Sequence, residues 1–218
     1  MGRSYCCSMP ETYINLVFED VLSETVLRRL LRSSATDYSV GQPLPANGYG
    51  WIKKKIRGLN AAAKGMAYLV LTDLDTYECA PALIREWLDV PRHPNLLFRV
   101  AVREVEAWLL GCRAGFAAFL GVPENRIPLN VDEIRDPKKF LVDLARRSRK
   151  RSICLDIVPR EGSTAKVGPN YNGRLVSFVE HYWDPSIARE CSLSLRKTMD
   201  ALDTFRPVLG ASQSPADC

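Results

Sequence analysis

Residues 68–75, Tyr-Leu-Val-Leu-Thr-Asp-Leu-Asp, form an apolar run of strand length that ends in two carboxylates one residue apart. In an extended backbone residues i and i+2 point to the same face, so Asp73 and Asp75 are expected to project together from the end of a buried strand. Burying two like charges costs free energy unless a cation such as Mg²⁺ neutralises them. The alternative is a strand that runs into an acidic turn whose aspartates cap the following helix.

The composition is that of a globular protein. The 218 residues, of which 46% are apolar, suffice for one large domain or for one domain with a substantial extension. We expect neither a membrane span nor a secretion signal, because the apolar stretches are only strand-sized. The seven cysteines are scattered without a Cys-x-x-Cys pair, and there are only two histidines, so a zinc site is not expected. These features favour a cytoplasmic protein with reduced thiols.

Strand and helix patterns alternate through the first half of the chain. Strands are predicted at 13–18, 67–73 and 96–103, and helices at 25–32 (with Ser23 as the N-cap), 51–64, 80–89 and 105–110. Residues 34–50 are expected to form a loop with a short strand near 38–40, because they contain several glycines and prolines. This alternation predicts an α/β fold with a mostly parallel sheet flanked by helices.

The strand signal fades beyond Gly111, where helices are predicted at 113–120, 137–150 and 187–202. The segment 158–173 is long and irregular, and loops of that length in a compact domain are often functional. We therefore expect an α/β core over residues 12–112, a mainly helical and basic C-terminal extension over 113–205, and a disordered tail over 206–218.

Acidic side chains follow the end of each of these three strands. They are Glu19 and Asp20 with Glu24 beyond them, Asp73 and Asp75, and Glu104 and Glu106. Because the carboxyl ends of parallel strands meet at one edge of a sheet, the acids are expected to converge there. This convergence favours a metal site over simple helix capping. Glu104 shares a face with Glu106 only if the third strand continues that far, since in a helix the two diverge.

The net charge of +5 is unevenly distributed along the chain. One basic cluster precedes the central strand, and a second lies in the C-terminal half: Lys53, Lys54, Lys55 and Arg57, then Arg146, Arg147, Arg149, Lys150 and Arg151. Clusters of this kind can match a phosphate backbone, which makes DNA or RNA a candidate partner. They can equally be solvated helix faces.

The order of these motifs resembles the Toprim fold of topoisomerases, primases and nucleases, in which a strand ending in glutamate precedes one ending in Asp-x-Asp. The chain is most similar to a family of small, largely uncharacterised bacterial Toprim-like proteins. It shares three motifs with that family: Phe18-Glu19-Asp20 with Ser23-Glu24, Leu71-Thr72-Asp73-Leu74-Asp75, and Glu106-Ala107-Trp108-Leu109-Leu110. The stretches Gly-Pro-Asn-Tyr-Asn at 168–172 and Ser-Leu-Ser-Leu at 192–195 extend the likeness through most of the chain.

The resemblance implies Mg²⁺- or Mn²⁺-dependent phosphodiester cleavage in proteins that work beside an ATPase partner in phage defence. Carried across by residue, it assigns metal binding to Asp73, Asp75, Glu19 and Glu106, and a catalytic role to an acid among Glu19, Asp20 and Glu24. Toprim proteins commonly have a glycine directly after this glutamate and an acid four residues on. Here Asp20 follows Glu19, and Glu24 lies five residues after Glu19. Whether Glu19 or Asp20 is the functional acid therefore stays open.

Metal-assisted cleavage of a phosphodiester also gains from a cation that stabilises charge in the transition state. Lys166, in the segment 158–173, is a candidate catalytic residue, whereas Lys64 suits the C-terminal turn of a helix. Three functions stay open: a metal-dependent nuclease, a non-catalytic Toprim-like module that docks on an ATPase or toxin, and a phosphoryl-transfer enzyme. The number of acids favours the nuclease. The sequence leaves a homo-oligomer open.

Overall fold

The computed structural model describes residues 11–46 and 48–208. Of the tail expected at 206–218, residues 209–218 lie outside this described part, as do Cys6, Cys7 and Cys218. The cysteines at positions 79, 112, 154 and 191 are free thiols. Among the described residues, no helix is both long enough and apolar enough to cross a membrane.

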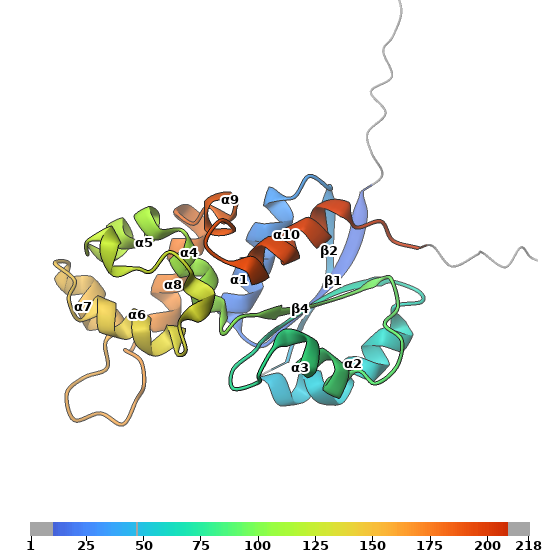
Figure 1. Cartoon of the computed structure of the whole chain (residues 1–218), viewed down its shortest axis with the longest axis horizontal. Coiled ribbons are helices and arrows are strands. Elements are labelled where there is room, and N and C mark those ends of the chain that lie inside the picture. Colours follow the sequence, from blue (N-terminus) through green and yellow to red (C-terminus); the bar gives the residue numbers. More distant parts are fainter. Residues whose placement is uncertain (1–10, 47, 209–218) are drawn as a thin grey trace, which may run out of the picture.

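A sheet of four parallel strands lies at the centre of the described chain and confirms the expected α/β fold (Figure 1). In spatial order the strands are β2 (Tyr38–Pro45), β1 (Thr12–Phe18), β3 (Ala67–Asp73) and β4 (Leu96–Ala101). Parallel strands covered on both faces are apolar at consecutive positions. Leu69 and Leu71 belong to the core on one face of the sheet, and Val70 between them belongs to the core on the other.

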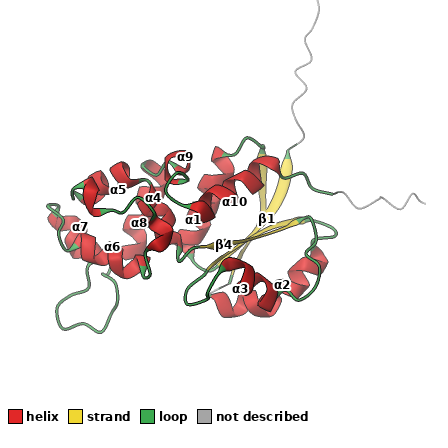
Figure 2. Cartoon of the chain, in the orientation of Figure 1, coloured by secondary structure: helices red, strands yellow, loops and turns green. Residues whose placement is uncertain are grey.

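Helices cover both faces of the sheet (Figure 2). One face packs against α2 (Tyr49–Ala62) and α3 (Ala80–Trp87). The other face shares its core with α1 and the C-terminal helices: α1 (Val21–Ser33), α4 (Val105–Gly111), α5 (Arg113–Leu120), α6 (Pro137–Ala145), α7 (Arg151–Ile157), α8 (Tyr171–His181), α9 (Pro185–Ala188) and α10 (Leu193–Thr204). Two 3₁₀ turns, Glu124–Arg126 and Val131–Glu133, lie between α5 and α6.

The core of the second face runs without interruption from the sheet into the C-terminal helices. Trp108 of α4 is fully buried, and its indole N–H donates to the hydroxyl of Ser194 at 2.8 Å. The Trp108 carbonyl accepts a hydrogen bond from the indole of Trp183 at 3.2 Å. The motif Glu-Ala-Trp-Leu-Leu is therefore built into the contact between the sheet and the C-terminal helices.

Several elements differ from the sequence-based prediction. Residues 38–45 form a full strand, β2, although they contain Gly41, Pro43 and Pro45. This strand lies at the edge of the sheet, where a residue without an N–H is tolerated. The predicted helix at 187–202 is instead two helices, α9 and α10, because Ser192 caps the start of α10 through a hydrogen bond from the Leu195 amide.

The predicted helix at 137–150 also ends early, at Ala145, and α7 begins separately at Arg151. Ser148 lies in the turn between them, where its hydroxyl accepts a hydrogen bond from the Lys150 amide at 2.9 Å. This local side-chain bond competes with the helical pattern. The basic cluster at 146–151 consequently lies mostly on a turn rather than along one helix face.

Candidate functional site

The carboxyl ends of β1, β3 and β4 lie side by side, as their pairing requires. Glu19 directly follows β1, Asp73 ends β3, and Glu104 is the N-cap residue of α4 after β4. Between β1 and β3 the order of the strands reverses, because β2 lies on one side of β1 and β3 on the other. Crevices at such a switch point are where open α/β sheets bind ligands.

Glu19 is anchored to the neighbouring strand. Its Oε1 accepts hydrogen bonds from the Thr72 hydroxyl and from the Asp73 amide, the latter at 3.1 Å. Burial raises the pKa of Glu19, against the effect of these two hydrogen bonds, and repulsion from Asp75 and Asp20 raises it further. This carboxylate is thus held in place by its neighbours while its charge is poorly compensated.

Asp73 lies among the other carboxylates at this edge of the sheet. Its Oδ1 accepts a hydrogen bond from the Val105 amide at 3.0 Å, which satisfies a free N–H in the first turn of α4. Burial raises the pKa of Asp73 well above its usual value, and repulsion from Glu106, Glu19 and Glu104 adds to the effect. Asp73 therefore bonds the first turn of α4 and does not cap the helix that follows β3 in the chain, α3, whose N-cap residue is Cys79.

Glu104 and Glu106 share one lysine. The Lys138 Nζ lies 3.5 Å from the Glu106 Oε1 and 3.9 Å from the Glu104 Oε1. Glu104 Oε2 also accepts a hydrogen bond from the Lys138 amide at 2.9 Å. Glu106 is almost fully buried and accepts a further hydrogen bond from the Tyr171 hydroxyl at 3.1 Å. The two glutamates do not diverge, because Glu104 lies in extended backbone before α4 begins.

Glu19, Asp73, Glu104 and Glu106 together form an acidic cluster. Burial raises the pKa of Glu104, and repulsion from Glu106 adds to that shift. Burial disfavours the charge on Lys138, but attraction to Glu106, Glu104 and Asp73 outweighs it and raises the pKa of the ammonium. One lysine therefore faces an excess of carboxylates.

The remaining acids named from the sequence have other positions. Asp20 is the N-cap of α1, where its Oδ1 accepts a hydrogen bond from the Ser23 amide at 2.8 Å, so Ser23 is not the cap. Glu24 forms an ion pair with Arg28 at 2.8 Å. Asp75 is exposed and lies beyond the end of β3, with a φ of 48°. The alternation argument that placed Asp73 and Asp75 on one face does not apply, because the strand has already ended.

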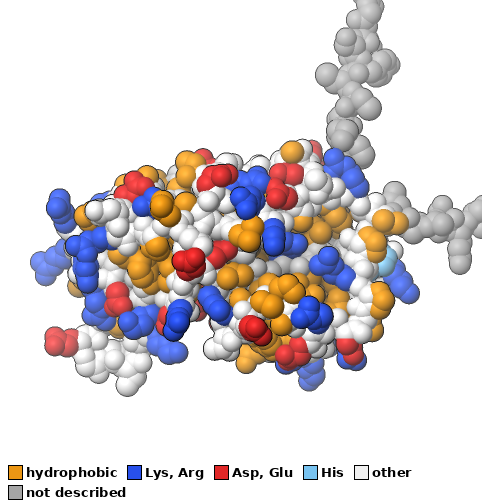
Figure 3. Space-filling model, viewed as in Figure 1, with side chains coloured by type: hydrophobic (Ala, Val, Ile, Leu, Met, Phe, Trp, Pro, Cys, Tyr) orange, Lys and Arg blue, Asp and Glu red, His pale blue; other side chains and the backbone are white. Residues whose placement is uncertain are grey.

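A cleft of about 910 Å³ adjoins the acidic cluster. Glu104 and Lys138 line it, together with Asp75 and with Lys166 from the loop between α7 and α8. Cations outnumber acids on its walls, which also include Arg103, Arg135, Asp136, Lys139, Asp143, Arg146, Arg160 and Glu161. Space-filling side chains show Lys and Arg gathered at the end of the molecule formed by α6 and α7 (Figure 3). Lys166 thus lines the same cleft as Glu104, the one member of the acidic cluster on its walls.

The two basic clusters do not form one surface. Lys53, Lys54, Lys55 and Arg57 lie on α2, on the opposite face of the sheet from α6 and α7. There Lys53 forms an ion pair with Glu86 at 2.7 Å, and Arg57 pairs with Asp89. In the second cluster Arg146 lines the cleft, and Arg147, Arg149 and Arg151 are exposed. The Lys150 ammonium donates to the carbonyls of Ala118 and Phe119 near the end of α5.

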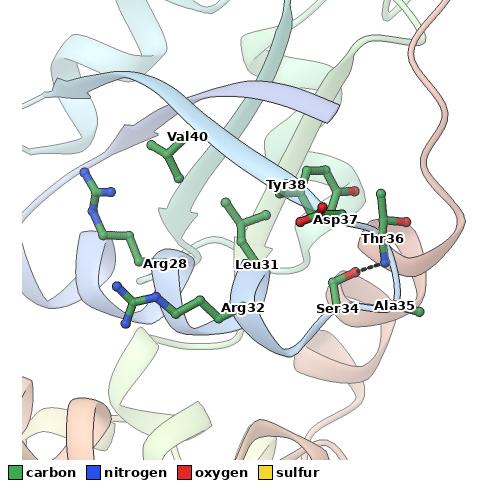
Figure 4. Close-up of a pocket in the computed structure, with 9 residues that line it drawn as sticks. All are labelled: Arg28, Leu31, Arg32, Ser34, Ala35, Thr36, Asp37, Tyr38 and Val40. Carbon is green, nitrogen blue, oxygen red and sulfur yellow. Dashed lines mark hydrogen bonds between the residues drawn. The ribbon is translucent and has the colours of Figure 1, made fainter. Parts of the chain in front are cut away.

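A second hollow of about 400 Å³ lies at the amino end of β2 (Figure 4). Arg28, Arg32 and Tyr38 line it, and burial raises the pKa of Tyr38 to about 12. The Tyr38 hydroxyl donates to the Leu202 carbonyl at 2.6 Å, which joins β2 to α10. This hollow lies at the amino edge of the parallel sheet, and the acidic cluster lies at the carboxyl edge.

The donor chemistry of the acidic cluster fits a hard divalent cation, since all its side chains offer carboxylate oxygens. Within residues 11–46 and 48–208, however, no group of three His, Cys, Asp or Glu side chains is arranged to hold a metal ion. A metal ion held by three of these carboxylates would therefore require them to move from the positions described. No family model, no curated protein and no solved structure matches this chain, so its own geometry carries the functional argument.

Sequence reasoning missed two residues of this site, Lys138 and Tyr171. Lys138 lies in a basic stretch whose other members are exposed, and nothing in the sequence distinguishes it from Lys139. The sequence did contain a signal for Tyr171, because this residue belongs to the Gly-Pro-Asn-Tyr-Asn stretch at 168–172 that resembles the Toprim-like family. Its contact with Glu106 joins residues that are 65 positions apart, which no local pattern reveals.

Proposed function

We propose that this protein is a Toprim-like nuclease that uses Mg²⁺ or Mn²⁺ to cleave phosphodiester bonds in DNA or RNA. The observation that carries the proposal is the acidic cluster, in which Asp73 is surrounded by carboxylates from adjacent strand ends. Such an excess of half-buried negative charge has a cost that a structural role does not require. The cleft beside it offers cations that suit a phosphate backbone.

A divalent metal bound here would activate a water molecule and stabilise the leaving oxygen. Glu19 and Asp73 would hold it, since the hydrogen bonds from Thr72, Asp73 and Val105 fix one oxygen of each carboxylate and leave the other oxygen to bind a metal. Lys166 and Arg146, which line the cleft, would orient the phosphate backbone. In the metal-free protein Glu106 contacts Lys138 and Tyr171, and its carboxylate would join the metal once the lysine moves away.

The test is a cleavage assay with end-labelled single- and double-stranded DNA and RNA in the presence of Mn²⁺ or Mg²⁺. Wild type is expected to cut at least one substrate, and Asp73→Asn is expected to reduce the rate at least about 100-fold, as loss of an essential charged group commonly does. Asp37→Asn is the matched control, because Asp37 is exposed and precedes β2 at the opposite edge of the sheet. Equal rates for wild type and Asp73→Asn would remove the acidic cluster from the reaction.

A second candidate function is a non-catalytic module that docks on an ATPase or toxin. The observation that favours it is the contact of Lys138 with Glu104 and Glu106, which already supplies one cation to the cluster. The printed sequence contains no Gly-x-x-x-x-Gly-Lys-[Ser/Thr] motif, so an ATPase activity in phage defence would come from a partner protein. Absence of cleavage of all four substrates with either metal would favour this module over the nuclease.

A further inference from the structure

Lys138 differs from every other cation near the cleft in what surrounds it. Its side chain is only 37% exposed, and its ammonium lies between Glu106, whose side chain is 4% exposed, and Glu104. Its neighbour Lys139 is 72% exposed and pairs with Asp143 on the surface of the same helix. The two lysines are adjacent in sequence, so their difference arises from the direction in which each side chain leaves α6.

The backbone holds Lys138 in this position. Pro137 begins α6, and Asp136 caps the helix by accepting a hydrogen bond from the Lys139 amide at 2.8 Å. The Lys138 amide donates to Glu104 at 2.9 Å, so the same carboxylate contacts both the amide and the ammonium of one residue. The start of α6 is thereby fastened to the residue that precedes α4.

The charges decide what this arrangement means for a metal ion. Lys138 is attracted to Glu106, Glu104 and Asp73, which are also the carboxylates that repel one another. A divalent cation that bound these carboxylates would lie beside the ammonium, and two positive charges that close repel each other. The ammonium and the metal therefore cannot both be held fully by the cluster.

We infer that Lys138 is the resident counter-cation of the acidic cluster and that a divalent metal ion must displace its ammonium in order to bind. This inference rests on the proposed metal-dependent function, and it adds that the Lys138 ammonium competes with the metal ion for the carboxylates. In the metal-free structure the carboxylates of Glu104 and Glu106 are instead arranged around this lysine. The displaced ammonium would remain beside the cleft that it lines.

The test measures Mn²⁺ binding by calorimetry and by the shift in melting temperature, with no nucleic acid present. Lys138→Met removes the charge and keeps an apolar stem, and it is expected to bind Mn²⁺ about tenfold more tightly than wild type, since a neighbouring like charge commonly shifts such an equilibrium by that much. Lys139→Met is the matched control and is expected to bind as wild type does. Without metal, Lys138→Met is expected to melt at a lower temperature than Lys139→Met.

Equal or weaker Mn²⁺ binding by Lys138→Met than by wild type would overturn the inference and leave the proposed nuclease standing. Failure of wild type and both variants to bind millimolar Mn²⁺ would overturn the inference and the metal site together. If Lys138→Met does not fold even with Mn²⁺, Lys138→Gln takes its place, because its amide can still donate a hydrogen bond to Glu106. The same expected ratio and the same contrary result apply to that variant.

Discussion

The Asp73 carboxylate is repelled by three neighbouring carboxylates and still accepts one backbone hydrogen bond. Its raised pKa in the folded state means that the unfolded chain loses this proton first as the pH rises. The Asp73 carboxyl therefore adds most to the free energy of unfolding below the pKa of the unfolded chain, about 3.9. This contribution is lost as the pH rises through the higher pKa of the folded state. At neutral pH the charge on Asp73 therefore destabilises the metal-free fold.

Asp73→Asn is expected to stabilise the metal-free protein at pH 7, because it removes a buried charge that Glu106, Glu19 and Glu104 repel. Asparagine keeps an oxygen that can accept the hydrogen bond from the Val105 amide. The gain should shrink as the pH falls and disappear well below about 3.9, where the wild-type carboxyl is protonated in both states. Urea denaturation at several pH values measures it, with Asp37→Asn as the control. A variant less stable than wild type at pH 7 contradicts this account.

The residues that could be named from the sequence lie at the end of a strand or within a few residues after it. Glu19, Asp73 and Glu106 were predicted to converge, and the structure places them within one acidic cluster. The sequence could not choose between Glu19 and Asp20, because that choice depends on where α1 begins. Asp20 caps this helix, so its neighbour Glu19 is the one turned toward Thr72 and Asp73. Lys138 was beyond reach, since its role depends on how α6 packs against α4.

At the scale of elements, the turn between α6 and α7 is the basic surface that adjoins the cleft. Arg147→Glu together with Arg151→Glu is expected to weaken nucleic-acid binding. The plot of log affinity against log salt should also become less steep by about 1 to 2, because each lost phosphate contact reduces the magnitude of its negative slope by about 0.9. Fluorescence anisotropy over a range of salt concentrations measures both effects. An unchanged slope would show that this turn does not contact phosphates.

The matched control for that experiment is Lys54→Glu together with Lys55→Glu on α2. These two lysines are exposed, and the double substitution changes the net charge by the same amount as Arg147→Glu with Arg151→Glu. They lie on the other face of the sheet, across from the helices that border the cleft. We expect the α2 variant to bind nearly as wild type does beyond the small effect of net charge. An equal loss in both variants would show that the effect is general rather than local.

The elements could be predicted where local patterns decide them. The predicted strands at 13–18 and 67–73 match β1 and β3 closely, because both are continuous apolar runs that the sheet buries. β2 was underestimated, since its prolines are acceptable only at a sheet edge, and edge position is a property of the whole fold. The breaks after Ala145 and before Leu193 depend on single serine side chains that local periodicity does not report.

At the scale of the whole molecule, one continuous core joins the sheet to the C-terminal helices. A fragment of residues 12–112 is therefore expected not to fold by itself. It would expose Trp108, which is fully buried and hydrogen-bonded to Ser194 and Trp183, and it would uncover the face of α1 that packs against α8. Circular dichroism during urea denaturation checks this expectation. A cooperative transition in the fragment would show that residues 12–112 form an independent domain.

The loop between α7 and α8 extends away from the helices, and its residues from Arg160 to Lys166 are exposed (Figure 2). Arg160 and Lys166, both on the wall of the cleft, are the only basic residues in that stretch, and trypsin cuts after such residues. Limited digestion of the free protein should nick the chain here first, since exposed loops are the preferred sites of proteolysis. An oligonucleotide lodged in the cleft would shield both peptide bonds, so the digestion pattern would report occupancy even for a ligand that is never cut.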